Sequence, residues 1–412
     1  MPTPPQIGSH RRLAAGVVAI CFTLGLASRG TFETFTVFLL PLAEAFDAPR
    51  SELTGIYATG FLAAGLGSPL AGLVFDRFGP GRLYPLGVVL AALSLLGLSF
   101  ATALWQFYVG WGLVLGLAGA MMGNVAHSAL LGRWFTTRLG TMISLVFSAM
   151  GVGVLLLVPL TQVLIELDGW RFALRALAAL FALVLLPLVL AAPWRRIMAG
   201  HPDYAAAGFA GAAEDFRDWT LNSAIRSVAF WGLVWVFFGT GAGIYAVTVQ
   251  LVAYLVEIGF PPLMAASAFG LTGILTPVGM LGFGWLSDRI GRRPAVGLSY
   301  GVTVAAFLGF LGLAPWPSDW LLGFAMICLG LSLGSRGPVI SAIASRLFQG
   351  PAFGRIYGVI LMGGGTGGAA GALIGGLMHD WTGGTQAVLY FGLAMVIAGS
   401  LPFWLVPAYA RH

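Results

Sequence analysis

Charged residues are scarce in this sequence of 412 residues. Only 9% of its residues are Asp, Glu, Lys or Arg, whereas a soluble domain carries about 25%. Hydrophobic residues make up 58% of the chain, and the mean hydropathy is +0.91. Water cannot solvate a surface of this composition, so we expect a lipid bilayer to surround most of the chain. The 60 glycines agree with this, because small residues let membrane helices pack closely.

Lysine is absent, and all 21 basic residues are arginine. The net charge of +6 and a pI near 9.7 are values that nucleic-acid-binding proteins also show. The arginines, however, stand singly or in pairs between apolar runs and do not form one basic face. The pattern therefore indicates orientation in a membrane, and we expect no nucleic-acid partner.

Cysteine and histidine are also few, at two and five residues. Cys21 and Cys328 lie inside separate apolar runs, where we expect buried thiols and no disulfide framework. Their spacing to the histidines does not match a metal site, and no P-loop for ATP is present. We expect no metal and no cofactor. No cluster of acids, histidines or cysteines gathers at one membrane face, which argues against an enzyme.

Long apolar runs fill the rest of the chain. A helix needs roughly 20 mostly apolar residues to cross a bilayer. We expect twelve such helices, at residues 13–42, 53–75, 83–101, 104–131, 141–165, 172–192, 225–256, 263–286, 295–313, 319–343, 355–378 and 386–408. The predicted fold class is an all-α, polytopic membrane protein. The polar segment 193–223 predicts a cytoplasmic linker between two six-helix bundles, at 1–192 and 224–412.

The arginines predict the orientation of these helices. With the N-terminus in the cytoplasm, sixteen arginines fall on the cytoplasmic side. Only Arg50 and Arg171 fall on the opposite side, and Arg175 lies just inside a helix. We therefore expect both termini in the cytoplasm and a multi-pass protein of a bacterial-type inner (plasma) membrane.

An internal repeat relates the two predicted bundles, at an offset of about 212 residues. Residues 76–79 (DRFG) correspond to residues 288–291 (DRIG), and Asp168 corresponds to Asp380. Because each half holds six helices, the two copies have the same orientation in the membrane. Such parallel repeats are related by an axis along the membrane normal, which predicts a pair of pseudo-symmetric bundles.

The repeated segments GLVFDRFGPGR (72–82) and GWLSDRIGRRP (284–294) resemble the cytoplasmic-loop motif G-x-x-x-D-R-x-G-R-R of the major facilitator superfamily. The resemblance covers nearly the whole chain. It implies a secondary transporter whose halves rock around a central site. It also implies that charged residues of both loops gate the cytoplasmic side, namely Asp76, Arg77, Arg82, Asp288, Arg289 and Arg292.

A finer resemblance points to the monocarboxylate transporter and oxalate/formate antiporter branch. It rests on TVFLLPLAEAF (36–46), GRWFTTRLGTMISLVFSAMGVG (132–153), ELDGWR (166–171) and FGRIYGVI (353–360). This branch implies a small organic anion as substrate, a mono- or dicarboxylate. The sequence departs from the branch at ASRGTF (27–32), and it lacks the arginine of helix 8 and the lysine of helix 11.

Polar residues in the middle of helices 1, 4, 7 and 10 are the candidate site residues, because the resemblance places the cavity there. Arg29 and Arg336 both lie mid-span, where a charge is costly unless it faces a cavity or a partner. Arginine can bind a carboxylate through two parallel hydrogen bonds, so one arginine from each half predicts a clamp on one anion. Three more side chains are candidate substrate contacts: Asn124, which is the repeat counterpart of Arg336, and Tyr245 and Gln250.

Two residues are candidate proton carriers. Glu33 lies one helical turn from Arg29, and His127 lies one turn from Asn124. Each also has an ordinary structural interpretation, as an ion-pair partner or a packing residue. We expect proton symport or exchange, in a monomer, since one chain contains both halves. The alternative function is efflux of drugs, arsenicals or another non-carboxylate solute.

Overall fold

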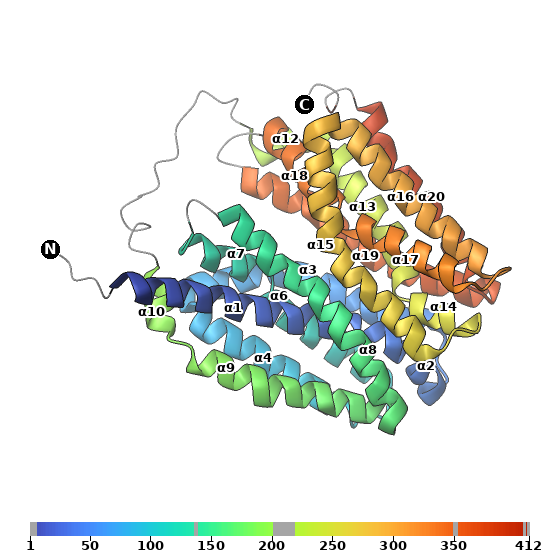
Figure 1. Cartoon of the computed structure of the whole chain (residues 1–412), viewed down its shortest axis with the longest axis horizontal. Coiled ribbons are helices and arrows are strands. Elements are labelled where there is room, and N and C mark those ends of the chain that lie inside the picture. The colour runs from blue at the N-terminus through green and yellow to red at the C-terminus, as the bar shows by residue number, and fades with distance from the viewer. Residues whose placement is uncertain (1–5, 136–138, 201–218, 349–352, 407–408, 410–412) are drawn as a thin grey trace.

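The computed structural model of the chain describes residues 6–135, 139–200, 219–348, 353–406 and 409 (Figure 1). Helices account for nearly all of this described part, which contains no β-strand. The N-terminal helices are α1 (Gln6–Glu33), α2 (Phe35–Phe46), α3 (Arg50–Phe78), α4 (Pro80–Leu98), α5 (Trp105–Phe107), the π-helical segment η1 (Tyr108–Leu115), α6 (Gly116–Met121), α7 (Asn124–Gly132), α8 (Leu139–Ala179), the π-helical segment η2 (Leu180–Leu185), α9 (Leu186–Ala191) and α10 (Trp194–Ala199). The C-terminal helices are α12 (Leu221–Ile225), α13 (Val228–Thr248), α14 (Leu251–Glu257), α15 (Pro262–Ile290), α16 (Arg292–Leu313), α17 (Asp319–Leu333), α18 (Arg336–Leu347), α19 (Phe353–Thr382) and α20 (Gln386–Leu405).

Ten helical stretches of the described chain are long and apolar enough to cross a membrane. One of them, Leu145–Ala191, is 47 residues long and turns back at Asp168 and Gly169, where the backbone is not helical. Gly169 has φ +75°, a conformation that glycine adopts without steric cost. This stretch therefore makes two crossings, and α17 with α18 makes one more, which brings the total to twelve. The predicted all-α, twelve-helix membrane fold is confirmed.

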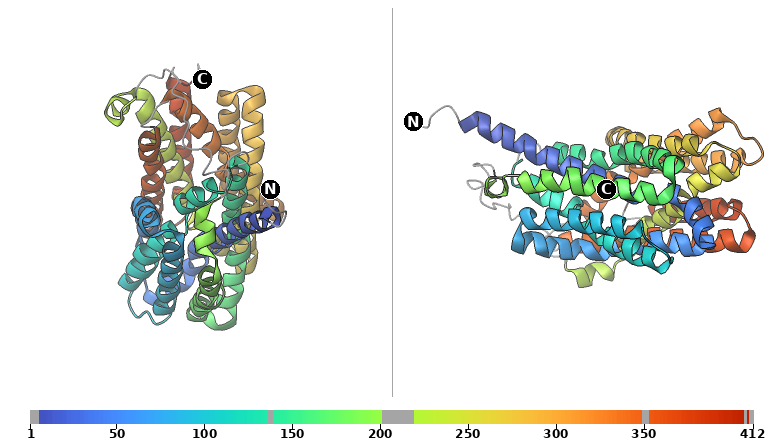
Figure 2. Two further views of the ribbon diagram at one scale, coloured as in Figure 1. Left: turned by 90° about the vertical axis from the view of Figure 1, so that its left-hand side faces the viewer. Right: turned by 90° about the horizontal axis from the view of Figure 1, so that it is seen from below.

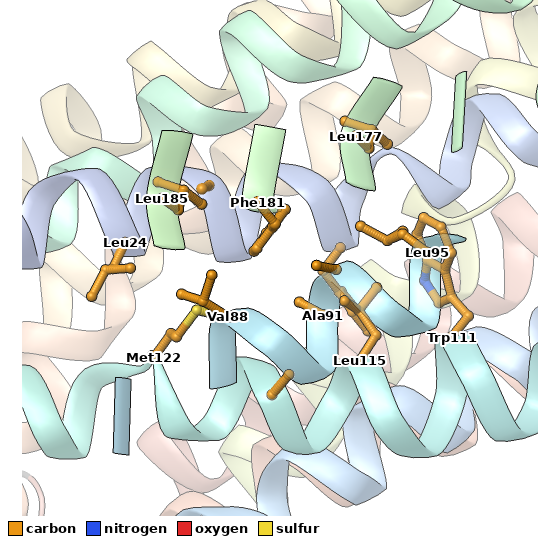
Figure 3. Close-up of a cluster of buried hydrophobic side chains, with 14 of the residues drawn as sticks. Leu24, Val88, Ala91, Leu95, Trp111, Leu115, Met122, Leu177, Phe181 and Leu185 are labelled. Carbon is orange, nitrogen blue, oxygen red and sulfur yellow. The ribbon is translucent and has the colours of Figure 1, made fainter. Parts of the chain in front are cut away.

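Two hydrophobic cores lie within this helical protein. One is built mainly from residues 17–197 and the other mainly from residues 224–409. Figure 3 shows the first core, in which Val88 of α4 and Phe181 of η2 are among the buried side chains. The predicted linker contains the short helix α10 and the first residues of α12, and its residues 201–218 lie outside the described part of the chain.

The halves meet chiefly along two helix pairs, α8 with α15 and α3 with α19. Figure 1 shows α8 and α15 side by side, and the view from below in Figure 2 shows the elongated shape of the helical body. At the α8–α15 contact, Gly151 and Gly273 face each other so closely that a Cβ at either would meet the other's backbone. The two halves therefore touch backbone to backbone, with no side chains to interlock them at this point.

A glycine face on α19 packs against α13. A Cβ at Gly367, Gly371 or Gly375 would meet the backbone of Phe238, Ala242 or Ala246, respectively. Small residues at this spacing are typical of closely packed membrane helices. Without side chains between them, the two backbones gain close van der Waals contact.

Replacing one of these glycines tests this packing. We expect Gly371→Ala to lower the thermal unfolding temperature of the detergent-purified protein, because overpacking a tight contact costs about 1–3 kcal/mol. Gly365→Ala is the matched control, since nothing lies within 4 Å of a Cβ at Gly365 on the same helix. Equal unfolding temperatures for the two variants would contradict the close α19–α13 contact.

Candidate substrate cavity

A cavity of about 850 Å³ lies between the two halves. Helices α1, α3, α6, α7 and α8 line it from the first half, and α13, α15 and α17 line it from the second. The lining thus includes the expected helices 1, 4, 7 and 10. It also includes α3, α8 and α15, which correspond to helices 2, 5 and 8 of the predicted series.

The four helices expected around the cavity are each interrupted. The interruptions fall at Thr34 between α1 and α2, at residues 122–123 between α6 and α7, at residues 249–250 between α13 and α14, and at residues 334–335 between α17 and α18. Discontinuous helices are common around transporter substrate sites, because irregular backbone is tolerated where it lines a cavity. They also place helix ends, with their partial charges, in the middle of the fold.

Arg29 lies on α1 and reaches into the cavity. Its guanidinium forms an ion pair with Glu33, one turn along the same helix. The same Nη2 atom donates a hydrogen bond of 3.1 Å to the hydroxyl of Tyr245 on α13. Arg29 therefore contacts both halves of the protein at once.

Glu33 is almost fully buried, and both of its carboxylate oxygens have partners. Oε1 pairs with Arg29, and Oε2 accepts a 2.8 Å hydrogen bond from the hydroxyl of Tyr57 on α3. Tyr57 is absent from the residues that the sequence singles out, because it lies in helix 2, which the resemblance does not place at the cavity. A tyrosine in an apolar run carries no local signal of this contact.

Aromatic rings surround the Arg29 guanidinium. Its Cζ lies 5.5 Å from the ring centroid of Phe61 and 5.8 Å from that of Phe32. The Phe61 ring in turn lies 4.5 Å from that of Tyr245, centroid to centroid. Ring faces at these distances attract a cation. They also present a flat apolar surface to any molecule that binds at Arg29.

Charge within the cavity is limited to this one pair. Among the lining residues that the structure describes, Arg29 and Glu33 are the only charged ones. The rest of the lining is apolar, glycine or small polar residues, together with Asn124 and Tyr245. Among the described lining residues, a charged solute can therefore find its counter-charge only at Arg29 or Glu33.

Of the other predicted residues in helices 4 and 7, one lines the cavity and two lie in the core. Asn124 lines the cavity at the start of α7. His127 does not line it: the ring is fully buried, and its Nδ1 lies 3.0 Å from the hydroxyl of Tyr84. Gln250 is also buried away from the lining, where its Nε2 donates to the carbonyl oxygen of Ala246 at 3.3 Å.

Arg336 begins α18 but points away from the cavity lining. It is 4% exposed, and its guanidinium donates to the hydroxyl of Thr303 and lies 4.2 Å from the ring centroid of Tyr300, both on α16. The two guanidinium groups expected to clamp one anion therefore do not converge in this conformation. The sequence places Arg336 at mid-membrane depth but cannot show which neighbour it faces.

Three of the predicted gating side chains lie outside the described residues: Asp76, Asp288 and Arg292. The other three arginines are exposed. Arg77 and Arg82 lie over the ring of Phe78, at 5.3 and 5.6 Å from its centroid. Arg289 lies 4.1 Å from the ring centroid of Trp285. The gating role of this loop stays a prediction.

The cavity lies at the middle of the two helices α3 and α15. Its lining on α3 runs from Phe61 to Ser68, in the direction of Arg77, and on α15 from Phe269 to Leu281, in the direction of Arg289. At the opposite end of α3 the two halves are joined by side chains of Glu257 and Asp380 that bind residues 50 and 51.

Comparison with known proteins identifies the family. The family model described as "Major Facilitator Superfamily" matches residues 18–336 and 278–411. Monocarboxylate transporter 13 of Bos taurus is 28% identical over 375 residues, which cover 90% of this chain and 84% of that protein. The uncharacterized MFS-type transporter YcxA of Bacillus subtilis (strain 168) is 26% identical over 399 residues, covering 92% and 93% of the two chains.

A solved structure shows the same fold. The crystal structure of a mutant of the nucleoside transporter NupG superposes with a TM-score of 0.73 at 16% sequence identity, covering 93% of this chain and 99% of that one. At this identity the likeness concerns the fold alone. With the family match over most of the sequence and the twelve-helix architecture around a central cavity, the chain belongs to the Major Facilitator Superfamily and is a multi-pass membrane transporter rather than an enzyme.

Proposed function

We propose that this chain moves a small organic anion with a carboxylate group across the membrane, with Arg29 as the residue that binds the carboxylate. One observation carries the proposal: the guanidinium of Arg29 lies in the cavity and is occupied by a carboxylate of the protein itself, that of Glu33. A substrate carboxylate is chemically equivalent to the group that already binds there. The names of the monocarboxylate transporters among its relatives support the same substrate class.

Proton coupling follows from the charge of this pair. When Glu33 takes up a proton it releases Arg29, whose fork of N–H donors then binds the substrate carboxylate. The empty site holds one positive and one negative charge. The loaded site holds the arginine, a neutral glutamic acid and a substrate anion, so its net charge is the same. An unchanged net charge lowers the cost of moving the loaded site through a low-dielectric membrane.

Tyr245 provides the link between binding and movement of the halves. Its hydroxyl accepts from Arg29 across the interface, so a substrate that engages Arg29 changes a contact between the two bundles. With the termini in the cytoplasm, as the arginine distribution predicts, the cavity of this conformation faces the cytoplasm. Alternating access then requires the Arg77 and Arg289 ends to close and the opposite end to open.

Anion binding by Arg336 stays a hypothesis, and it concerns another conformation of the protein. To reach the cavity, its guanidinium has to leave Thr303 and Tyr300 on α16. The neighbouring residues Leu333 and Gly334 already line the cavity, at the break between α17 and α18. A rotation of α18 at this break provides the route.

A second candidate function is efflux of a flat, uncharged or cationic solute such as a drug, and the aromatic lining favours it. Phe32, Phe61, Phe147, Phe269 and Tyr245 all line the cavity. Competition experiments in proteoliposomes separate the two functions. Inhibition of transport by lactate, formate or oxalate supports the carboxylate proposal, and inhibition by planar aromatic cations alone supports efflux.

Replacing Arg29 tests the binding role directly. We expect Arg29→Lys to lower uptake of a radiolabelled carboxylate at least about tenfold, because one ammonium group cannot reproduce the two parallel hydrogen bonds of the guanidinium. Uptake is measured in proteoliposomes with an imposed pH gradient. Arg175→Lys is the matched control, because Arg175 lies outside the cavity lining and contacts Ser99 and Phe100.

Removing both charges tests the pair without leaving a buried ion unpaired. The double variant Arg29→Gln/Glu33→Gln is expected to insert and purify as the parent does but to lose carboxylate uptake. Wild-type uptake by either Arg29 variant would contradict the assignment of the site.

A further inference from the structure

We infer that Asp380 is a latch that holds the closed end of the transporter. Asp380 lies near the end of α19 in the second half, and both its oxygens accept backbone N–H groups at the start of α3 in the first half. Oδ1 accepts from Arg50 at 2.9 Å and Oδ2 from Ser51 at 2.8 Å. A carboxylate at a helix N-terminus satisfies free N–H groups and interacts favourably with the helix dipole.

An ion pair beside this cap joins the same two halves. Arg50 of α3 pairs through its guanidinium with Glu257, the last residue of α14. The backbone and the side chain of Arg50 are thus held by two different acids of the second half. When the halves separate at this end, as the outward-open state requires, all three contacts break together.

Within the described contacts, this cap forms at one of the two repeat-related positions. The counterpart of Asp380 is Asp168, and the counterpart of Arg50 is Pro262, the first residue of α15. Proline has no backbone N–H, so the start of α15 lacks one of the two donors that the cap uses. Within the described contacts, Asp168 forms no hydrogen bond to α15. Asp168 is therefore a natural control for Asp380.

The latch is tested by the accessibility of the cavity from the Asp380 side. A reporter cysteine replaces Thr248, which lines the cavity, and both native cysteines are buried. Intact cells and inverted vesicles are labelled with a membrane-impermeant maleimide. We expect Asp380→Ala to raise labelling of the reporter cysteine several-fold, and only from the membrane side on which Asp380 lies. Labelling of Asp168→Ala is expected to equal that of the Thr248→Cys parent. Glu257→Gln, which leaves the cap intact, is expected to raise it less.

Labelling of Asp380→Ala equal to that of the Thr248→Cys parent from both sides would overturn the latch. An equal rise in Asp168→Ala would do the same, because it would show a general loosening of the bundles. If Asp380→Ala does not accumulate in the membrane, Glu257→Gln is used in its place. Labelling of Glu257→Gln equal to that of the Thr248→Cys parent would then overturn the latch.

Discussion

The ion pair between Arg29 and Glu33 is the interaction on which the candidate site depends. A lone charge at mid-membrane depth is costly, so Arg29 requires a partner whenever no substrate is bound. Glu33 provides that partner from the same helix, and Tyr57 and Tyr245 complete the hydrogen bonding from α3 and α13. Under the proposed function, the free transporter already holds at Arg29 a group of the same chemistry as its carboxylate substrate. Binding is then an exchange of one carboxylate for another, which is reversible, as transport requires.

The second constraint is that the two halves move without unfolding. Where α8 meets α15, Gly151 and Gly273 place backbone against backbone, so neither residue contributes a side chain that interlocks the two helices at this point. Directional contacts concentrate instead at the Arg50 end of α3, where acids of the second half bind both its backbone and its guanidinium. Polar contacts thus hold the two halves together at the Arg50 end of α3, and the hydrogen bond from Arg29 to Tyr245 joins them at the cavity. The breaks in helices around the cavity supply further points of bending.

The sequence predicts some of the residues that line the cavity and misplaces others. Arg29, Glu33, Asn124 and Tyr245 were expected near the substrate, and all four line the cavity. Arg336, His127 and Gln250 lie at the expected depth but face their own half, against α16, Tyr84 and Ala246. Depth follows from counting residues along an apolar run. The direction in which a side chain points depends on helix rotation, which the sequence of one helix does not specify when apolar residues surround it on every side.

The sequence by itself determined the class of the molecule. The scarcity of charge required a bilayer, the lengths of the apolar runs set the number of crossings, and the repeated DRxG loops identified the family. These are properties of composition and spacing, which a chain carries before it folds. Only the tertiary structure decided that Tyr57 reaches Glu33 and that Asp380 caps α3, because each contact joins residues that are distant in sequence. Such pairings arise when helices pack, and a linear pattern does not contain them.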